Sequence, residues 1–194
     1  MNKKIEIEIP EGKVAEWKEI NGVTTLVLVD EVDNRPVTER IKTFKDACDE
    51  LGRMAEKGDD TAANLLSDYE SNGNNILVKQ TSATMKLSII AYALNEGWEP
   101  HFTKDEYRYY PWFYLYTQED IDNMDEEKKK KLWLFGGASA DGASCGLAFA
   151  CSDSPWSSSG AHVSARLAVK SDELAVYFAK QFIDIWADYL APAK

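Results

Sequence analysis

The chain has 194 residues, 44% of them hydrophobic, and a formal net charge of -11. This composition is ample for a packed core, but the acidic balance argues against nucleic-acid binding, which needs an excess of Lys and Arg on one face. No stretch approaches the roughly 20 apolar residues that span a bilayer, so no membrane insertion is expected. The N-terminus has no apolar run typical of a signal peptide, which favours a cytoplasmic or virion-associated protein.

The N-terminal residues predict strands. Residues 3–9 alternate between polar and apolar types, the period of a half-buried strand. Asn21 and Gly22 then separate two β-rich runs, and this dipeptide favours a tight hairpin because both turn residues must adopt positive φ. An antiparallel sheet of about three strands is therefore expected in this part of the chain.

Helices are predicted after the strands, at residues 43–57, 61–69, 82–96 and 171–189. Thr43 and Ser171 are suitable N-caps for the first and last of them, and the last has apolar residues at a spacing of three to four. The expected fold class is therefore α+β. We expect a single globular unit of residues 1–194, with a subdivision into residues 1–75 and 76–194 as the alternative.

An aromatic run, Tyr107 to Tyr116, precedes the last predicted helix. It favours a strand packed on the core with an amphipathic rim, and a stacking platform for a base or a sugar is the functional alternative. The acidic-then-basic residues 117–131 predict a helix whose charges complement its dipole. Residues 132–135 predict a short buried strand, and residues 167–169 predict a last strand.

No motif for catalysis, metal or cofactor is found. Gly136 and Gly137 lack the continuation of a Walker loop or a dinucleotide fingerprint. The serines near His162 lack a nucleophile elbow, and Cys145, Cys151 and His162 match no standard zinc spacing. We therefore expect no enzyme activity, no metal and no cofactor. The two cysteines are expected to be free thiols in a reducing compartment, with a pair under oxidising conditions left open.

Residues 135–166 form a Gly/Ser-rich segment that differs from the rest of the chain. Glycines at 136, 137, 142 and 146 permit tight turns, and the residues between them are mostly small and polar. The pattern predicts ordered loops whose shape depends on glycines and on a few apolar anchors. The segment resembles the variable region of diversity-generating-retroelement target proteins. The resemblance lies in these motifs: Phe135-Gly136-Gly137, Gly142, Gly146-Leu147, Ser154-Pro155-Trp156-Ser157 and Val163-Ser164-Ala165-Arg166.

The resemblance implies a C-type-lectin-like fold for residues 76–194 and an origin in phages or gut-associated bacteria. It implies a protein or glycan ligand that binds through residues 135–166, as in a phage-associated receptor binder. The chain lacks the Glu-Pro-Asn-type calcium motif of animal lectins, so calcium-dependent sugar binding is not expected.

The candidate ligand-binding residues lie within this segment. Phe149 and Trp156 would be the anchors, because affinity often depends on a few exposed aromatic residues. The polar contacts would be Ser139, Asp141, Ser144, Asp153, Ser158 and His162. We expect these side chains on one exposed face, because the glycine turns should fold the segment back on itself. The alternative is a structural or assembly protein of a phage or mobile element, in which residues 135–166 pack at an oligomer interface.

Overall fold

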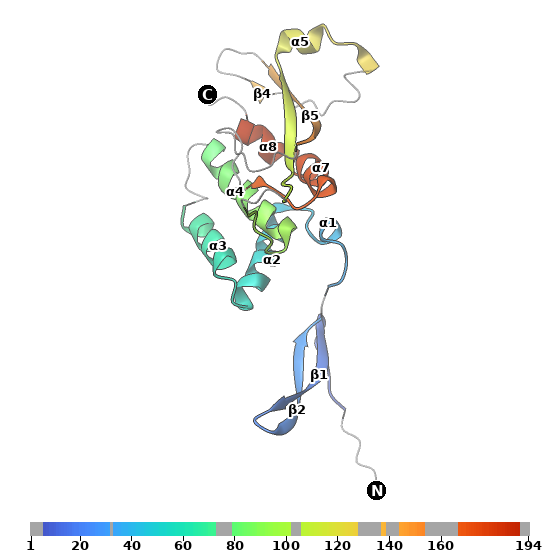
Figure 1. The fold of residues 1–194 in the computed structure, drawn as a ribbon, viewed down its shortest axis with the longest axis vertical. Coiled ribbons are helices and arrows are strands. Elements are labelled where there is room, and N and C mark those ends of the chain that lie inside the picture. The colour runs from blue at the N-terminus through green and yellow to red at the C-terminus, as the bar shows by residue number, and fades with distance from the viewer. Residues whose placement is uncertain are drawn as a thin grey trace. The chain divides into compact units, whose positions relative to one another are not determined.

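The chain has a mixed α+β fold, and a computed structural model describes residues 6–31, 33–72, 79–101, 106–127, 137–138, 144–153 and 167–190. For residues 137–138 and 144–153 the description covers the backbone only. The chain divides into two compact units, Met1–Pro36 and Val37–Lys194, each of which is described by itself (Figure 1). The subdivision near residue 75 falls inside the second unit, where helices from both sides of that point pack together.

The first unit is a β-hairpin. Its strands, β1 (Lys13–Ile20) and β2 (Val23–Asp30), pair antiparallel along their full length. Asn21 and Gly22 join them with φ angles of 54° and 77°, as a two-residue turn of type I′ requires. The predicted hairpin is thus confirmed.

The predicted strand at residues 3–9 is not found in its described part, residues 6–9, so the sheet has two strands and not three. The turn before β1 gives a physical reason. The Lys13 N–H donates to the carbonyl of Pro10 at 3.1 Å, and Gly12 has a φ of 76°. A turn with positive φ at its third residue alone splays the flanking strands apart.

The second unit begins with four helices: α1 (Val37–Arg40), α2 (Phe44–Glu56), α3 (Asp60–Asn72) and α4 (Lys79–Asn95). The last three confirm the helices predicted at residues 43–57, 61–69 and 82–96. Thr43 caps α2 as predicted: its side chain accepts from the N–H of Asp46, and the Asp46 carboxylate accepts from the N–H of Thr43. This reciprocal pair satisfies two donors that a helix start leaves open.

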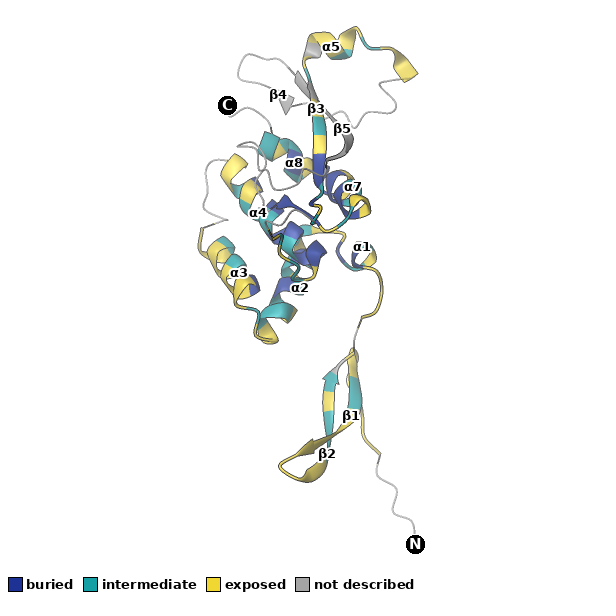
Figure 2. Ribbon diagram, viewed as in Figure 1, coloured by how far each residue is buried: buried dark blue, intermediate teal, exposed yellow. Residues whose placement is uncertain are grey.

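The core of the second unit surrounds α4. Leu87, Ile90 and Leu94 have no exposed surface, and α4 contacts α2, α3 and both C-terminal helices. Figure 2 shows buried residues concentrated where these helices meet. Because α4 is apolar on more than one side, it is covered from several directions, as its sequence predicts.

Two helices end the described chain: α7 (Asp172–Gln181) and α8 (Ile183–Leu190). The single helix predicted at residues 171–189 is therefore interrupted at Phe182, whose φ is -114°. The indole N–H of Trp186 donates to the carbonyl of Phe178 at 3.2 Å, which satisfies a carbonyl whose regular helical donor would be Phe182. Phe182 is 4% exposed, so the residue at the break is buried in the core.

A three-stranded antiparallel sheet lies beside α7: β3 (Tyr110–Tyr116), β4 (Gly137–Ala138) and β5 (Ser144–Asp153), in the order β3-β5-β4. The aromatic run thus forms a strand, as predicted. Residues 144–153, in contrast, form a ten-residue strand where loops were expected. The strand predicted at residues 167–169 is reduced to one bridge, in which Val169 and Tyr109 exchange backbone hydrogen bonds of 2.9 and 3.1 Å.

The helix predicted at residues 117–131 is interrupted within its described part, because residues 123–125 are not helical and residues 126–127 are helical again. Thr117 caps its first part, α5 (Gln118–Asp122), which ends at Asn123. The Asn123 amide donates to the carbonyl of Glu119 at 2.9 Å, a local bond by which Asn competes with helix continuation. Residues 128–136, which include the strand predicted at 132–135, lie outside the described residues.

Candidate functional site

Three of the eight predicted ligand-binding residues lie on β5. Ser144 begins the strand opposite Ala138, Phe149 lies opposite Phe113, and Asp153 ends the strand opposite Tyr110. Their side chains are not described. The other five lie outside the described residues: Ser139, Asp141, Trp156, Ser158 and His162.

The segment folds back on itself only in part. β4 pairs antiparallel with the start of β5, as the glycines predict. From Ser144 to Asp153, however, the backbone is extended, and at the usual rise of a strand its ends are about 30 Å apart. The expectation of one compact loop cluster is therefore wrong for this stretch. Cys145 and Cys151, both on β5, are about 20 Å apart by the same rise, too far for a disulfide or a shared metal.

The two faces of β3 carry different side chains. On one face Phe113 packs against Trp186 of α8, with ring centroids 5.2 Å apart. On the other face Trp112 is 40% exposed and Tyr114 is 56% exposed. Tyr116 shares that face by strand alternation, and its ring lies 6.1 Å from that of Tyr114. We call Trp112, Tyr114 and Tyr116 the aromatic face.

Small residues lie opposite the aromatic face on β5. Tyr114 pairs with Ala148, and Tyr116 pairs with Gly146. Directly opposed residues are the nearest cross-strand neighbours in a sheet, and neither glycine nor alanine has a side chain long enough to cover a ring. The sequence therefore places wide aromatic surfaces beside a strand that cannot bury them, which is an arrangement suited to stacking against a ligand.

Buried and charged groups flank this face. Before β3, Arg108 is completely buried and Tyr110 is 3% exposed. Burial raises the pKa of Tyr110, and the nearby charge of Arg108 partly offsets this effect. After β3, the Thr117 side chain and backbone N–H donate to Asp120, which lowers the pKa of that carboxyl. Asp120 therefore stays ionised and gives this end of the strand a negative charge.

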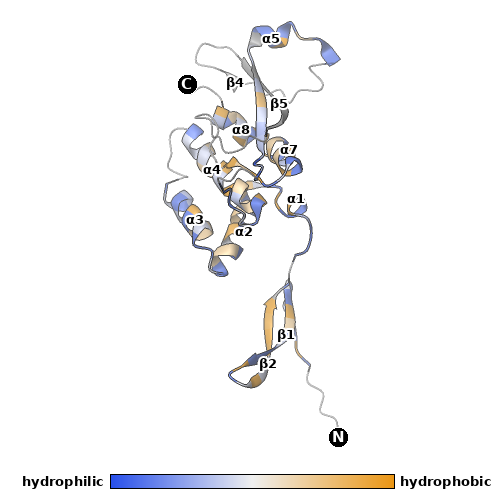
Figure 3. Ribbon diagram, viewed as in Figure 1, coloured by the Kyte–Doolittle hydropathy of each residue, from blue (hydrophilic) through white to orange (hydrophobic). Residues whose placement is uncertain are grey.

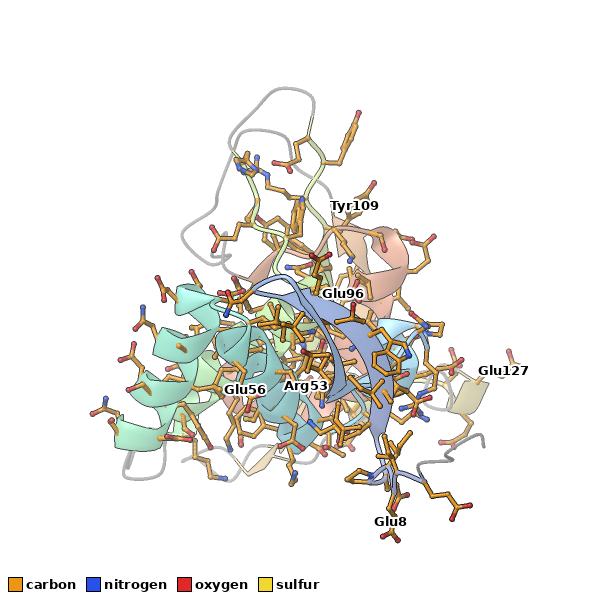
Figure 4. All side chains as sticks on the ribbon, turned by 90° about the horizontal axis from the view of Figure 1, so that it is seen from below. Glu8, Arg53, Glu56, Glu96, Tyr109 and Glu127 are labelled. Atoms are coloured by element: carbon orange, nitrogen blue, oxygen red, sulfur yellow. The ribbon has the colours of Figure 1, made fainter. Side chains whose placement is uncertain are left out.

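A second polar cluster has a structural role. Arg40 Nη1 lies 2.9 Å from Glu50, and its Nη2 lies 2.6 Å from Glu96, which also binds Lys170 at 2.7 Å. Arg53 pairs with Glu50 as well; Figure 4 shows Arg53 and Glu96 among the side chains of the unit. Burial by itself would raise the pKa of Glu50, but hydrogen bonds from Arg53 and Arg40 outweigh it, so the pKa is lowered. These charges hold α1, α2 and the end of α4 together.

The sequence contained a signal for the aromatic face. Positions 112, 114 and 116 hold Trp and Tyr, which are amphipathic, whereas Phe113 and Leu115 between them are purely apolar. This alternation separates a core face from an outer face. The predicted strand with a core side and an amphipathic rim agrees with this arrangement, and a stacking platform remains the functional alternative for the rim.

Among the described residues, no group of three or more His, Cys, Asp or Glu side chains could hold a metal ion. In the same part of the chain, no helix has the length and apolar character needed to cross a membrane. Comparisons of the chain with protein-family models, with curated proteins and with solved structures find no match.

Proposed function

We propose that the chain is a ligand-binding and display protein, with a surface made by residues 135–166 together with the aromatic face of β3. The observation that supports this most is the exposure of Trp112 and Tyr114 beside the small residues of β5. Binding surfaces often use Trp and Tyr, because these side chains offer a large contact area at a low cost in conformational entropy. The ligand is a protein or a glycan, and the chain acts as a binder and not as an enzyme.

The sequence resemblance to diversity-generating-retroelement variable proteins supports the same proposal. In such a protein, side chains within residues 135–166 vary while the backbone that carries them keeps its conformation. The paired backbone of β5 suits that role, because ladder hydrogen bonds do not depend on side-chain identity. A C-type-lectin-like arrangement of residues 76–194 and a phage or gut-bacterial origin are parts of this proposal.

A binding screen tests the proposal. The full chain is applied to an array of oligosaccharides and to a peptide-display library, in parallel with a Trp112→Ala/Tyr114→Ala variant. Ile7→Ala is the matched control, because Ile7 is exposed, precedes the strands of the hairpin and lies in the other unit. We expect a ligand that binds the wild-type chain and the control, and binds the double variant at least about tenfold more weakly, since hot-spot aromatic residues typically contribute about 2 kcal/mol or more.

Two outcomes would count against the proposal. One is that no oligosaccharide or peptide is retained by the wild-type chain. The other is that every ligand found is held equally by the double variant. Either result would favour the second candidate, a structural or assembly protein of a phage or mobile element. The observation in favour of that candidate is the exposed apolar surface of the N-terminal hairpin.

A further inference from the structure

The described part of the N-terminal unit contains no buried residue. Burial is described for residues 6–29, 31 and 33–36; Trp17 is 70% exposed and Val23 is 63% exposed. Figure 3 shows that much of β2 is hydrophobic. A two-stranded hairpin alone is at best marginally stable in water, and further strands are needed for independent stability. A strand added to the edge of this hairpin would therefore stabilise it.

We propose that β1 pairs antiparallel with β1 of a second copy of this chain, around a two-fold axis at Trp17. The product is a four-stranded sheet in the order β2-β1-β1-β2, with one hairpin from each copy. This inference does not depend on the ligand-binding function proposed above. Three observations support it: the direction of the backbone groups, the order of the charges and the position of Trp17.

In β1, the backbone N–H and C=O groups that point away from β2 belong to odd-numbered residues. The two-residue turn makes Ile20 and Val23 a hydrogen-bonded pair. Eight residues before Ile20, the carbonyl of Gly12 accepts from the N–H of Glu31 at 2.9 Å. Even-numbered residues of β1 therefore face β2, and antiparallel alternation directs the backbone groups of Ala15, Trp17 and Glu19 to the other edge. A two-fold pairing must place odd-numbered residues opposite odd-numbered residues.

The charges of β1 distinguish among the registers that this rule allows. With Trp17 opposite Trp17, each Glu16 lies opposite Lys18 of the other copy, and each Val14 lies opposite Ile20. Shifting the register by two residues in one direction places Glu16 opposite Glu16, and in the other direction places Lys18 opposite Lys18. Like charges that are directly opposed are destabilising, whereas opposite charges stabilise a sheet. The register centred on Trp17 is therefore favoured over its neighbours.

The surroundings of Glu16 and Lys18 within one chain support the same register. On β2 their opposed residues are uncharged, Val27 for Glu16 and Thr25 for Lys18. The two side chains pair only along the strand, at 3.6 Å, and both remain about half exposed, at 52% and 51%. A second copy would supply each charge with an opposite charge across the new strand pair, so that the four charges alternate in sign.

The other face of the sheet gains an apolar row. Trp17 pairs with Leu26 of β2, so the two-fold axis places Leu26, Trp17, Trp17 and Leu26 side by side across four strands. Cross-strand pairs of aromatic and apolar residues are a main source of sheet stability. The most exposed large side chain of the hairpin would thus gain contacts that its own chain does not provide.

Charge exchange tests the proposal on the full chain, with the mass measured by sedimentation equilibrium. The wild-type chain should be a dimer. Glu16→Lys and Lys18→Glu, each measured alone, should weaken association about tenfold or more, because both opposed ion pairs of the dimer become like-charge pairs. An equimolar mixture of the two variants should restore the dimer, since one chain then has only positive charges at these two positions and the other has only negative charges.

The mixture is the decisive sample. Each variant keeps like charges within its own β1, so mixing can restore association only if the charges meet between chains. Glu8→Lys is the control: it changes the net charge as Glu16→Lys does, at an exposed position outside the strands, and should leave the dimer intact. A monomeric wild-type chain, a mixture that remains monomeric, or a dimer unaffected by either single change would each overturn the proposal. In the last case, pairing through β2 or another surface would be the explanation.

Discussion

The two units of the chain bury their apolar residues to very different extents. In the second unit Leu51, Leu87 and Phe178 have no exposed surface, whereas in the hairpin Trp17 is 70% exposed and Val23 is 63% exposed. Both regions are rich in large apolar side chains, so the difference does not arise from composition. It arises from the number of elements that each region packs against: α4 contacts four other helices, whereas among the described strands β1 pairs with β2 alone.

The comparison predicts that the same type of change has different effects in the two units. Phe178→Ala should lower the free energy of unfolding of the second unit by about 3–5 kcal/mol, as expected for truncation of a buried aromatic residue. The Phe178 ring packs against Trp186 with centroids 4.9 Å apart and against Phe182 with centroids 6.2 Å apart. Urea unfolding followed by the helical circular dichroism signal measures this change.

Trp17→Ala is the matched change in the hairpin. It should leave the helical unfolding transition within about 0.5 kcal/mol of wild type, because the hairpin is a compact unit separate from the helices. If the two variants destabilised the helices equally, the hairpin would be part of the same cooperative unit, and the division into two units would be wrong.

Lowering the pH should weaken the charge cluster that stabilises the helical unit. Glu50, whose side chain is 12% exposed, accepts hydrogen bonds from two arginines, and its pKa is lowered from the ordinary 4.5. The unfolded chain therefore takes up the proton first as the pH falls. The contribution of Glu50 to stability is complete above about pH 4.5, decreases below that pH and is lost once the pH passes the lowered pKa.

Glu50→Gln should accordingly cost about 2 kcal/mol near neutral pH, as expected for hydrogen bonds to charged groups, and should cost less in acid. Urea unfolding at a series of pH values measures both effects. Glu56→Gln, at an exposed position of the same helix, is the control and should follow the wild-type curve. If the loss of unfolding free energy in Glu50→Gln did not become smaller in acid, the carboxylate charge would not be the stabilising feature.

A third, smaller effect is expected where α4 meets the start of α3. The hydroxyl of Tyr92 donates to Asp59, with both carboxylate oxygens at 3.0 Å. Burial and this hydrogen bond raise the pKa of Tyr92 from 10.0 to about 12. The contribution of this hydrogen bond to the free energy of unfolding is therefore present below pH 10 and is lost as the pH rises through about 12. Tyr92→Phe should cost about 1 kcal/mol near neutral pH.

Alkaline titration of the phenolate absorbance measures the same bond independently. The difference between wild type and Tyr92→Phe should show one tyrosine that ionises late. Tyr114→Phe, which removes an exposed hydroxyl elsewhere, is the control and should leave the late-ionising tyrosine in place. If the late-ionising tyrosine were still present in Tyr92→Phe, Asp59 would not hold the Tyr92 proton.

The features predicted correctly from the sequence depend on few neighbouring residues. The hairpin follows from Asn21 and Gly22, and the start of α2 follows from Thr43 and Asp46, three residues apart. Each involves backbone groups that a local side chain or turn type satisfies. The aromatic strand is similarly visible in the composition of its own residues.

The features that were missed depend on contacts between distant parts of the chain. The residues of β5 are mostly glycine, alanine, serine and cysteine, which do not favour strands by themselves. They form one because β3, earlier in the chain, offers an edge with which they pair. The break at Phe182 depends likewise on packing, since the pattern of apolar residues runs through it without interruption. Of the candidate site, the sequence indicated the segment 135–166 but predicted loops where β5 forms, and the outward orientation of Trp112 and Tyr114 required the sheet.

The smallest expected effect separates the two faces of β3. Tyr114→Ser should change the free energy of unfolding by no more than about 0.5 kcal/mol, because Tyr114 is 56% exposed and its opposed residue is Ala148. Phe113→Ala, one residue earlier, should cost about 2 kcal/mol or more, since this ring packs on Trp186. Thermal and urea unfolding of the two variants gives the comparison directly.

If Tyr114→Ser were as damaging as Phe113→Ala, the aromatic face would be part of the packed structure. Its exposure would then no longer support a binding surface, and the structural candidate would be preferred. A small loss at Tyr114 together with a large loss at Phe113 would leave the aromatic rings available to a ligand without cost to the fold.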